Sequence, residues 1–204
     1  ALKARRRHFA AHWGDWGACA QAAQTGTERR VFAALKAAQK PDFHRAFKLL
    51  PTDDISFAFS AYQSHLWNAT LAAYLHATLP AEKLCETKGT AGPYVFFRDQ
   101  PPEELEGEQS VPGRDDWNGP KPLLELLRQK IQQEGLEPDK FGLNTPAKSA
   151  MNSYMRPLLL RPAGLALTDS APDAKYRDRI RLQLRFTLPR GSFATMLIKR
   201  LTML

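Results

Sequence analysis

The feature that most constrains this fold is the segment from Asp54 to Thr78, which predicts one long helix. Pro80 ends it, because proline lacks an amide hydrogen and disfavours helical backbone in the residue before it. Apolar side chains lie on several sides of this helix rather than along one stripe. A helix of that kind is buried on several sides, so we expect it to be the central helix of the fold.

Shorter helical segments precede the long helix. Residues 3–24 have a helical composition, although Gly14 weakens the middle of the segment. Thr27 is a suitable N-cap for a second helix that runs to about residue 39, and Asp42 is a suitable N-cap for a short third one. The first half of the chain is therefore predicted to be helical.

Residues 81–120 have a different character, with clustered glycine, proline and acidic residues. We expect turns and loops there, with one short strand at residues 94–98. Pro122 then opens a helix. Its side chains at helical spacing predict a buried stripe of Leu123, Leu126, Leu127 and Ile131.

The last third of the chain predicts strands. Residues 155–162 are expected to be extended and residues 168–174 to form a turn. Residues 179–186 alternate strictly between arginine or glutamine and apolar side chains, which is the pattern of a strand with two different faces. A final helix is expected from Phe193 onward. The predicted fold class is α+β, with a helical N-terminal half, a loop-rich mixed middle, C-terminal antiparallel strands and a last helix.

The net charge of +8 is unevenly distributed. Residues 1–50 carry a net +7, residues 51–150 a net −6 and residues 151–204 a net +7. Basic ends favour a polyanionic partner such as a nucleic acid. The alternative is that these cations lie on solvated faces and only keep the protein in solution. The arginine face of residues 179–186 has the same two interpretations, a solvated sheet face or a surface for phosphates.

The joint between this strand and the last helix reads Leu-Pro-Arg-Gly-Ser. Pro189 ends strand pairing, Gly191 permits a left-handed turn, and Ser192 is a suitable N-cap. Arg190 is not required by any of these roles. An arginine beside a helix N-terminus can bind an anion together with the helix amides. A plain turn and an anion site both remain open on these residues.

Several function classes lack their usual signature. No apolar run is long enough for a membrane span, and the basic start leads into no signal-peptide core. Two cysteines, Cys19 and Cys85, are too few for a disulfide framework and fit a reducing, cytoplasmic setting. His8 and His12 have a metal-ligand spacing but no acidic or cysteine partner nearby. Phosphate-loop, nucleophile-elbow and zinc-protease motifs are absent from the sequence. We expect no membrane and no metal.

Five segments, taken in order, resemble the TruD family of tRNA pseudouridine synthases. They are SAYQSHLWN (60–68), SVPGRDDW (110–117), IQQEGLEPDKF (131–141), MRPLLLRPAGLAL (155–167) and FTLPRGSFAT (186–195).

The resemblance implies a pseudouridine synthase catalytic domain interrupted by an insertion, the TRUD domain. Residues 1–165 would belong to the insertion and residues 166–204 to the end of the catalytic domain. Such enzymes isomerise a uridine in tRNA to pseudouridine after flipping the base out of its stack. The family implies tRNA as the partner, a monomer, and neither a metal nor an organic cofactor.

The same resemblance implies that the catalytic part is missing. The family's catalytic aspartate motif and its Asn-Tyr-Phe-Gly-type motif precede the region seen here, and neither occurs in this sequence. We therefore expect this sequence to be the C-terminal portion of a longer enzyme, with its first residue at a cut inside that protein. It should contain no catalytic residue and have no activity by itself. Phe193 stands where the family often has tyrosine. The residues expected at the RNA-binding surface or active-site cleft are Arg190, Gly191, Ser192, Phe193, Arg156 and Arg185.

Two other functions remain possible on the sequence. A non-catalytic RNA-binding or assembly module would use the same basic ends. A metal-dependent hydrolase would need His8 and His12 as ligands, but the sequence offers them no further ligands.

Overall fold

The computed structural model describes residues 2–89, 91–141, 151–189 and 191–203, which form two compact units. The first unit comprises residues 2–64 with Phe141, Met151 and Asn152. The second comprises residues 65–140 and the described residues from Ser153 on.

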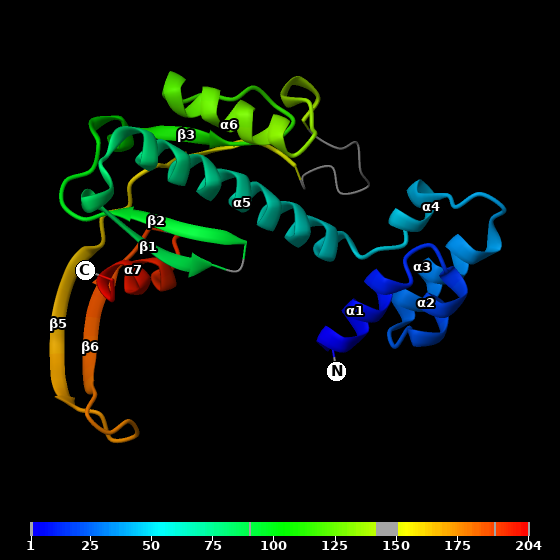
Figure 1. The fold of residues 1–204 in the computed structure, drawn as a ribbon, viewed down its shortest axis with the longest axis horizontal. Helices are drawn as coiled ribbons and strands as arrows, with labels where there is room; N and C mark the ends of the chain where they lie inside the picture. The colour runs from blue at the N-terminus through cyan, green and yellow to red at the C-terminus, as the bar shows by residue number, and fades with distance from the viewer. Residues whose placement is uncertain (1, 90, 142–150, 190, 204) are drawn as a thin grey trace. The chain divides into compact units, whose positions relative to one another are not determined.

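The first unit is helical. Its elements are α1 (Leu2–Ala11), α2 (Trp16–Ala22), α3 (Gly26–Ala37), α4 (Phe43–Phe47) and the beginning of α5 (Thr52–Thr78) (Figure 1). The single helix predicted for residues 3–24 is in fact two. The break falls where Gly14 has φ +105°, a left-handed conformation that favours glycine. Asp15 then restarts the helix by accepting from the Ala18 N–H at 2.9 Å.

The core of the first unit is built from aromatic and aliphatic side chains of α2, α3 and α4. Its buried members are Cys19, Ala23, Phe32, Leu35 and Ala46. From α1, the Phe9 ring packs 4.8 Å from that of Phe32. Burial, with the charge of Asp15, raises the pKa of the Cys19 thiol, which therefore stays protonated in this core.

The start of α3 lies two residues earlier than predicted. Thr25, and not Thr27, is the N-cap, and its hydroxyl accepts from the Glu28 N–H at 3.1 Å. The Glu28 carboxylate accepts in return from the N–H groups of Thr25 at 3.0 Å and Gln24 at 2.8 Å. This reciprocal capping box satisfies amides that have no partner within the helix. The prediction that Asp42 caps α4 is confirmed, because its carboxylate accepts from the Arg45 N–H at 2.9 Å.

The second unit is mixed. It contains the rest of α5, the helices α6 (Lys121–Gln133) and α7 (Ala194–Leu201), and single 3₁₀ turns at Ala81–Lys83, Glu103–Glu106 and Pro138–Lys140. Its strands form three antiparallel pairs. They are β1 (Leu84–Gly89) with β2 (Gly92–Phe97), β3 (Glu108–Val111) with β4 (Tyr154–Pro157), and β5 (Ala163–Pro172) with β6 (Ile180–Thr187).

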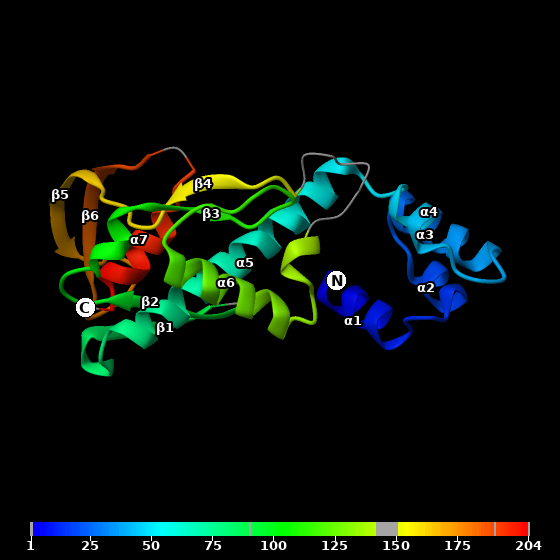
Figure 2. The ribbon, with the colours of Figure 1, turned by 90° about the horizontal axis from the view of Figure 1, so that it is seen from above.

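The core of the second unit surrounds α5, which lies between the β1–β2 hairpin and α6 (Figures 1 and 2). Its buried members are Tyr74, Leu75, Leu84, Leu105 and Leu123. Burial raises the pKa of Tyr74 to about 12, helped by its hydrogen bond to Glu104 and by the charge of that carboxylate. The hydroxyl therefore remains a neutral donor at physiological pH.

The α+β class is confirmed, with a helical first half, antiparallel strand pairs after it and a final helix. α5 is confirmed with a start two residues earlier than predicted, and so is the stripe of α6, in which Leu123, Leu127 and Ile131 are buried and Leu126 is half-buried. The strand predictions were less accurate. The sequence did not predict β1 or β3, and residues 168–172, expected to turn, continue β5. The strand expected over 155–162 ends at Pro157. Asp169, Ser170 and Pro172 are turn-forming residues, but in β5 they are paired with β6.

The β5–β6 hairpin has the two faces that its sequence predicts, but described residues leave the apolar face uncovered. Leu167, Ile180 and Leu182 are 58, 70 and 59% exposed. The hairpin extends away from the rest of its unit (Figure 1). Large apolar patches of this kind are uncommon on monomeric proteins and mark surfaces that contact a partner.

Replacing Glu28 by Gln is expected to lower the free energy of unfolding by roughly 0.5 kcal/mol, because the amide can still accept in the capping box but the negative charge at the helix N-terminus and beside Arg5 is lost. Although burial acts to raise it, hydrogen bonds from Thr25 and Gln24 and the charge of Arg5 hold the pKa of Glu28 below 4.5 in the folded protein. The stabilisation is therefore complete above pH 4.5 and is lost as the pH falls through the lower, folded pKa. Urea titrations of both proteins between pH 3 and 7 measure this, and a difference independent of pH would contradict it.

The exposed hairpin face is expected to make the 204-residue chain self-associate. Ile180→Lys combined with Leu182→Lys should reduce this association, because the two lysines interrupt the apolar face. Gln183→Lys adds charge on the opposite face and serves as the control. Sizing chromatography with light scattering measures the mass, and a monodisperse monomer for the unmodified chain would contradict the prediction.

Candidate nucleic-acid interface

The joint after β6 forms a tight turn. Gly191 has φ +84°, so the left-handed residue expected from the sequence is present. The Ser192 N–H donates to the Pro189 carbonyl at 3.2 Å and closes the turn. Arg190, the residue for which an anion-binding role was predicted, lies outside the described residues.

The start of α7 differs from the prediction in one respect. Phe193, and not Ser192, is the N-cap, because the turn that Ser192 closes delays the helix by one residue. Among the described residues, no side-chain hydrogen bond caps this terminus, and the first turn of the helix contains no acidic residue. Phe193 itself is 61% exposed. The helix dipole favours an anion at this end of a helix.

Two cations near the C-terminus of α7 hold the helix on β2. The Arg200 guanidinium lies 4.7 Å from the Phe97 ring centroid and donates to the carbonyls of Phe97 at 3.0 Å and Arg98 at 3.3 Å. Lys199 lies 5.3 Å from the Tyr94 ring centroid. These contacts fix α7 against the β1–β2 hairpin and thereby fix where its N-terminus lies within the second unit.

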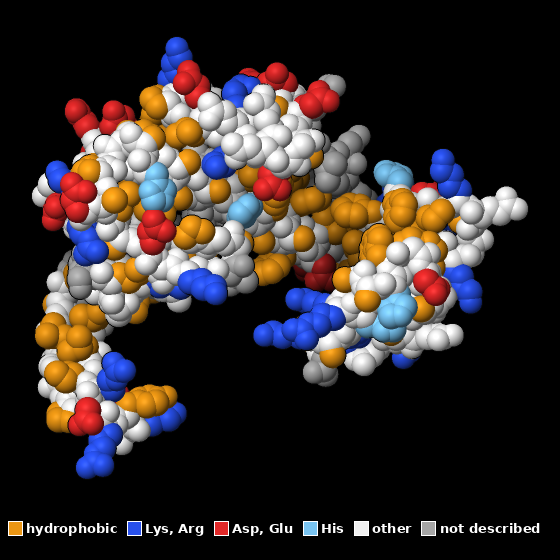
Figure 3. Space-filling model, in the orientation of Figure 1, with side chains coloured by type: hydrophobic (Ala, Val, Ile, Leu, Met, Phe, Trp, Pro, Cys, Tyr) orange, Lys and Arg blue, Asp and Glu red, His pale blue; other side chains and the backbone are white. Residues whose placement is uncertain are grey.

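The hairpin that leads into the joint is rich in exposed cations, which alternate with its apolar side chains (Figure 3). Within the described residues, Arg181 alone among them forms an ion pair, with Asp169 at 2.7 Å. Arg185, a predicted interface residue, is exposed opposite Ala166. The exposed basic residues of this segment are Lys175, Arg177, Arg179, Arg181 and Arg185.

Arg156 lies elsewhere. It is on β4, opposite Gln109 of β3, and its guanidinium is 5.7 Å from the Trp67 ring centroid. No hydrogen bond, ion pair or ring contact among the described residues joins Arg156 to Arg185 or Phe193. The predicted site residues therefore fall into two places, the β6–α7 region and the β3–β4 pair.

One polar feature on the strand paired with Arg156 was not predicted from the sequence. The amide oxygen of Gln109 is buried and has no hydrogen-bond partner in the described part of the chain. Gly119 approaches the same side chain so closely that an added Cβ would lie 2.8 Å from Gln109 Cγ. A buried, unpartnered oxygen is costly, and no local sequence pattern predicts it.

The other chemical classes gain no support. The rings of His8 and His12 stack 4.1 Å apart, and His12 Nδ1 lies 2.9 Å from the His8 carbonyl oxygen. The described residues contain no group of three or more metal-ligating side chains placed to hold an ion. Among the same residues, no helix is long and apolar enough to cross a membrane.

Comparison with known proteins identifies the family. The family model for tRNA pseudouridine synthase D (TruD) matches residues 2–201. The chain belongs to the TruD family. The resemblance found in the sequence motifs therefore extends over nearly the whole chain.

Curated TruD relatives are distant in sequence. The tRNA pseudouridine synthase D of Leptospira interrogans is 24% identical over 93% of this chain, and that of Aquifex aeolicus is 28% identical over 93%. The match covers 48% of each relative. The chain thus spans about half the length of the curated relatives it matches.

A crystal structure of a TruD protein from Methanosarcina mazei shares the fold. It superposes with a TM-score of 0.66 at 18% identity, over 97% of this chain and 49% of that one. At this identity the likeness concerns the fold alone.

Replacing Arg200 by Gln should release α7 from β2, because the guanidinium contacts both a ring and two carbonyls there. We expect amide hydrogen exchange to accelerate in α7 while β1 and β2 keep their protection. Lys199→Gln, which loses only a ring contact, is the matched control and should have the smaller effect. Unchanged exchange in the Arg200 variant would show that α7 is held by other contacts.

Proposed function

We propose that this chain is the C-terminal half of a tRNA pseudouridine synthase, which isomerises a uridine in tRNA to pseudouridine. The observation that carries the proposal is the family match over residues 2–201. Because the product is an isomer of the substrate, the reaction gains and loses no atoms overall. It therefore needs no cosubstrate for its balance.

The proposal places residues 1–165 in the TRUD insertion and residues 166–204 in the catalytic domain. The uncovered apolar face of β5–β6 supports this division, since a sheet face of this kind belongs against other apolar residues. In the complete enzyme we propose that the catalytic half covers it.

The catalytic aspartate is proposed to lie in the other half of the enzyme. None of Asp15, Asp53, Asp54 and Asp99 matches the family's aspartate motif. Two of them also have no environment that would suit a nucleophile, since Asp15 caps α2 and Asp53 lies in the exposed first turn of α5. This chain would then supply RNA contacts rather than the covalent chemistry.

The β6–α7 region is proposed to contact the RNA. Arg185 and Arg190 would bind backbone phosphates near the uncapped end of α7, where amides and the helix dipole also favour an anion. Gly191 keeps the backbone in the turn that this arrangement needs, and Phe193 offers an exposed ring. Arg156, held over Trp67, would act at a second position.

A second function remains a candidate, a non-catalytic RNA-binding or assembly module. The observation that favours it is the combination of exposed hairpin cations with an exposed apolar face, which together suit binding to RNA and to another protein segment. The two functions differ in whether an aspartate motif precedes this region in the complete reading frame.

The protein expressed from its complete reading frame is expected to form pseudouridine in unmodified tRNA transcripts, detected by carbodiimide labelling. The 204-residue chain alone is expected to form none. An intact mass of 22.9 kDa for the natural protein, or inactivity of a longer one on all tRNA transcripts, would exclude the synthase and leave the binding module.

In the active protein, Arg190→Ala should lower RNA affinity or turnover roughly tenfold, because a charge-assisted contact is lost. Lys88→Ala, which removes an exposed cation of β1, is the matched control. If the Arg190 variant binds RNA and turns over as the unsubstituted protein does, the proposed role of Arg190 is excluded.

A further inference from the structure

The solvent-facing side of α1 is basic and contains no carboxylate. Its exposed residues include Lys3, Arg6 and Arg7 together with Ala10 and Ala11. Residues three and four apart are neighbours on a helix surface, so the three cations form one group. The small alanines beside them leave room for a bulky polyanion to approach the helix closely.

The cations are not neutralised within their unit because helix capping occupies the nearby carboxylates. Residues 2–64 hold ten lysines and arginines but only five acidic residues. Asp15, Glu28 and Asp42 each accept from backbone amides at the start of a helix, and Asp53 and Asp54 lie in the first turn of α5. Glu28 also contacts Arg5, at 3.1 Å, and in the described chain no carboxylate lies within ion-pair distance of the exposed α1 cations.

An exposed aromatic ring follows the basic face directly. Trp13 is 65% exposed, although its ring packs edge-on against Trp16 at 5.2 Å. Trp16 in turn contacts Phe43 at 5.9 Å. The indole of Trp13 therefore packs against one ring, that of Trp16, while much of its surface faces solvent, which suits stacking on a nucleobase.

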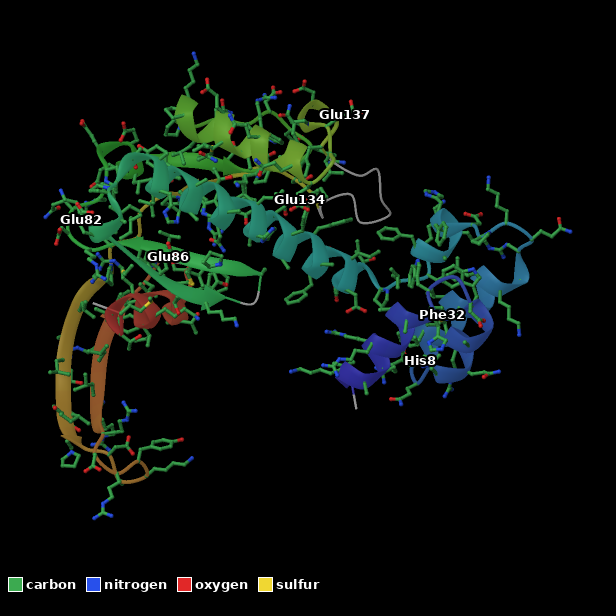
Figure 4. All side chains as sticks on the ribbon, viewed as in Figure 1. His8, Phe32, Glu82, Glu86, Glu134 and Glu137 are labelled. Atoms are coloured by element: carbon green, nitrogen blue, oxygen red, sulfur yellow. The ribbon has the colours of Figure 1, made fainter. Side chains whose placement is uncertain are left out.

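The opposite side of α1 anchors this surface to the folded unit. Phe9 packs on Phe32, and His8 lies on the same inward side of the helix (Figure 4). Of the two large apolar side chains in the described part of α1, Phe9 packs in the core and Leu2 is 50% exposed, so a single large side chain is left for insertion into a membrane surface. The exposed chemistry is cationic and aromatic, which favours a single-stranded or looped nucleic acid.

We propose that the α1 face binds RNA, with Lys3, Arg6 and Arg7 on phosphates and Trp13 stacked on an unpaired base. The choice of RNA rests on the proposed function. This surface lies in the first unit and is distinct in its residues from the β6–α7 region. It gives the enzyme a second RNA-binding surface, which is distant in sequence from the joint between β6 and α7.

The test measures the affinity of the 204-residue chain for a fluorescently labelled tRNA transcript as a function of salt. Arg6→Glu with Arg7→Glu should weaken binding at least about tenfold and lower the slope of log affinity against log salt by about 1.5. Glutamate has a high helix propensity, similar to that of arginine, so α1 should still fold. Lys88→Glu with Lys121→Glu makes the same charge change at exposed positions of the second unit and should leave the affinity within about twofold.

Trp13→Leu separates stacking from charge. It should weaken binding about fivefold or more without changing the salt slope. Equal losses in both double variants, or no loss in Arg6→Glu with Arg7→Glu, would overturn the proposal. A complete protein that forms no pseudouridine, while this chain binds tRNA through α1, would remove the synthase function and leave the α1 surface in place.

Discussion

The burial of α5 on several sides is the constraint on which the rest of the structure depends. Its first turns place Ile55 against side chains of α4 and the following loop, and its later turns place Tyr74 and Leu75 in the core of the second unit. The polar side chains that α5 buries are hydrogen-bonded. The Thr70 hydroxyl donates to the Leu66 carbonyl at 2.9 Å, and the Gln63 amide donates to the Asn152 carbonyl at 3.1 Å. One helix thus supplies apolar surface to a small cluster in the first unit and to the core of the second, which explains its mixed rather than striped pattern.

Local signals explain why the helices were predictable. Asp42 and the Pro122 region mark helix starts through contacts within one turn, and the α6 stripe follows the helical period. The strands depended on distant partners. β3 pairs with β4 about 45 residues later, and nothing in its own four residues specifies that pairing. Short strands of this kind are recognised only once their partners are in place.

The candidate site was predictable to a similar degree. The turn at Gly191 follows from glycine's conformational freedom, and the sequence alone locates it. The bare terminus of α7 does not follow, because it depends on which of Ser192 and Phe193 becomes the N-cap. The buried oxygen of Gln109 depends on the approach of Gly119, ten residues away. The family match, which covers residues 2–201, adds a relationship to known proteins that local physics cannot supply.

The use of Asp15, Glu28 and Asp42 as caps has a thermodynamic consequence for the helical unit. Three of its five carboxylates stabilise helix starts in this way, and its ten lysines and arginines are left with an excess of positive charge that repels itself. Screening by salt weakens repulsion between exposed charges. The melting temperature of this unit is therefore expected to rise with ionic strength. A fold that depends on surface ion pairs would show the opposite change. The helical unit is thus least stable in dilute buffer.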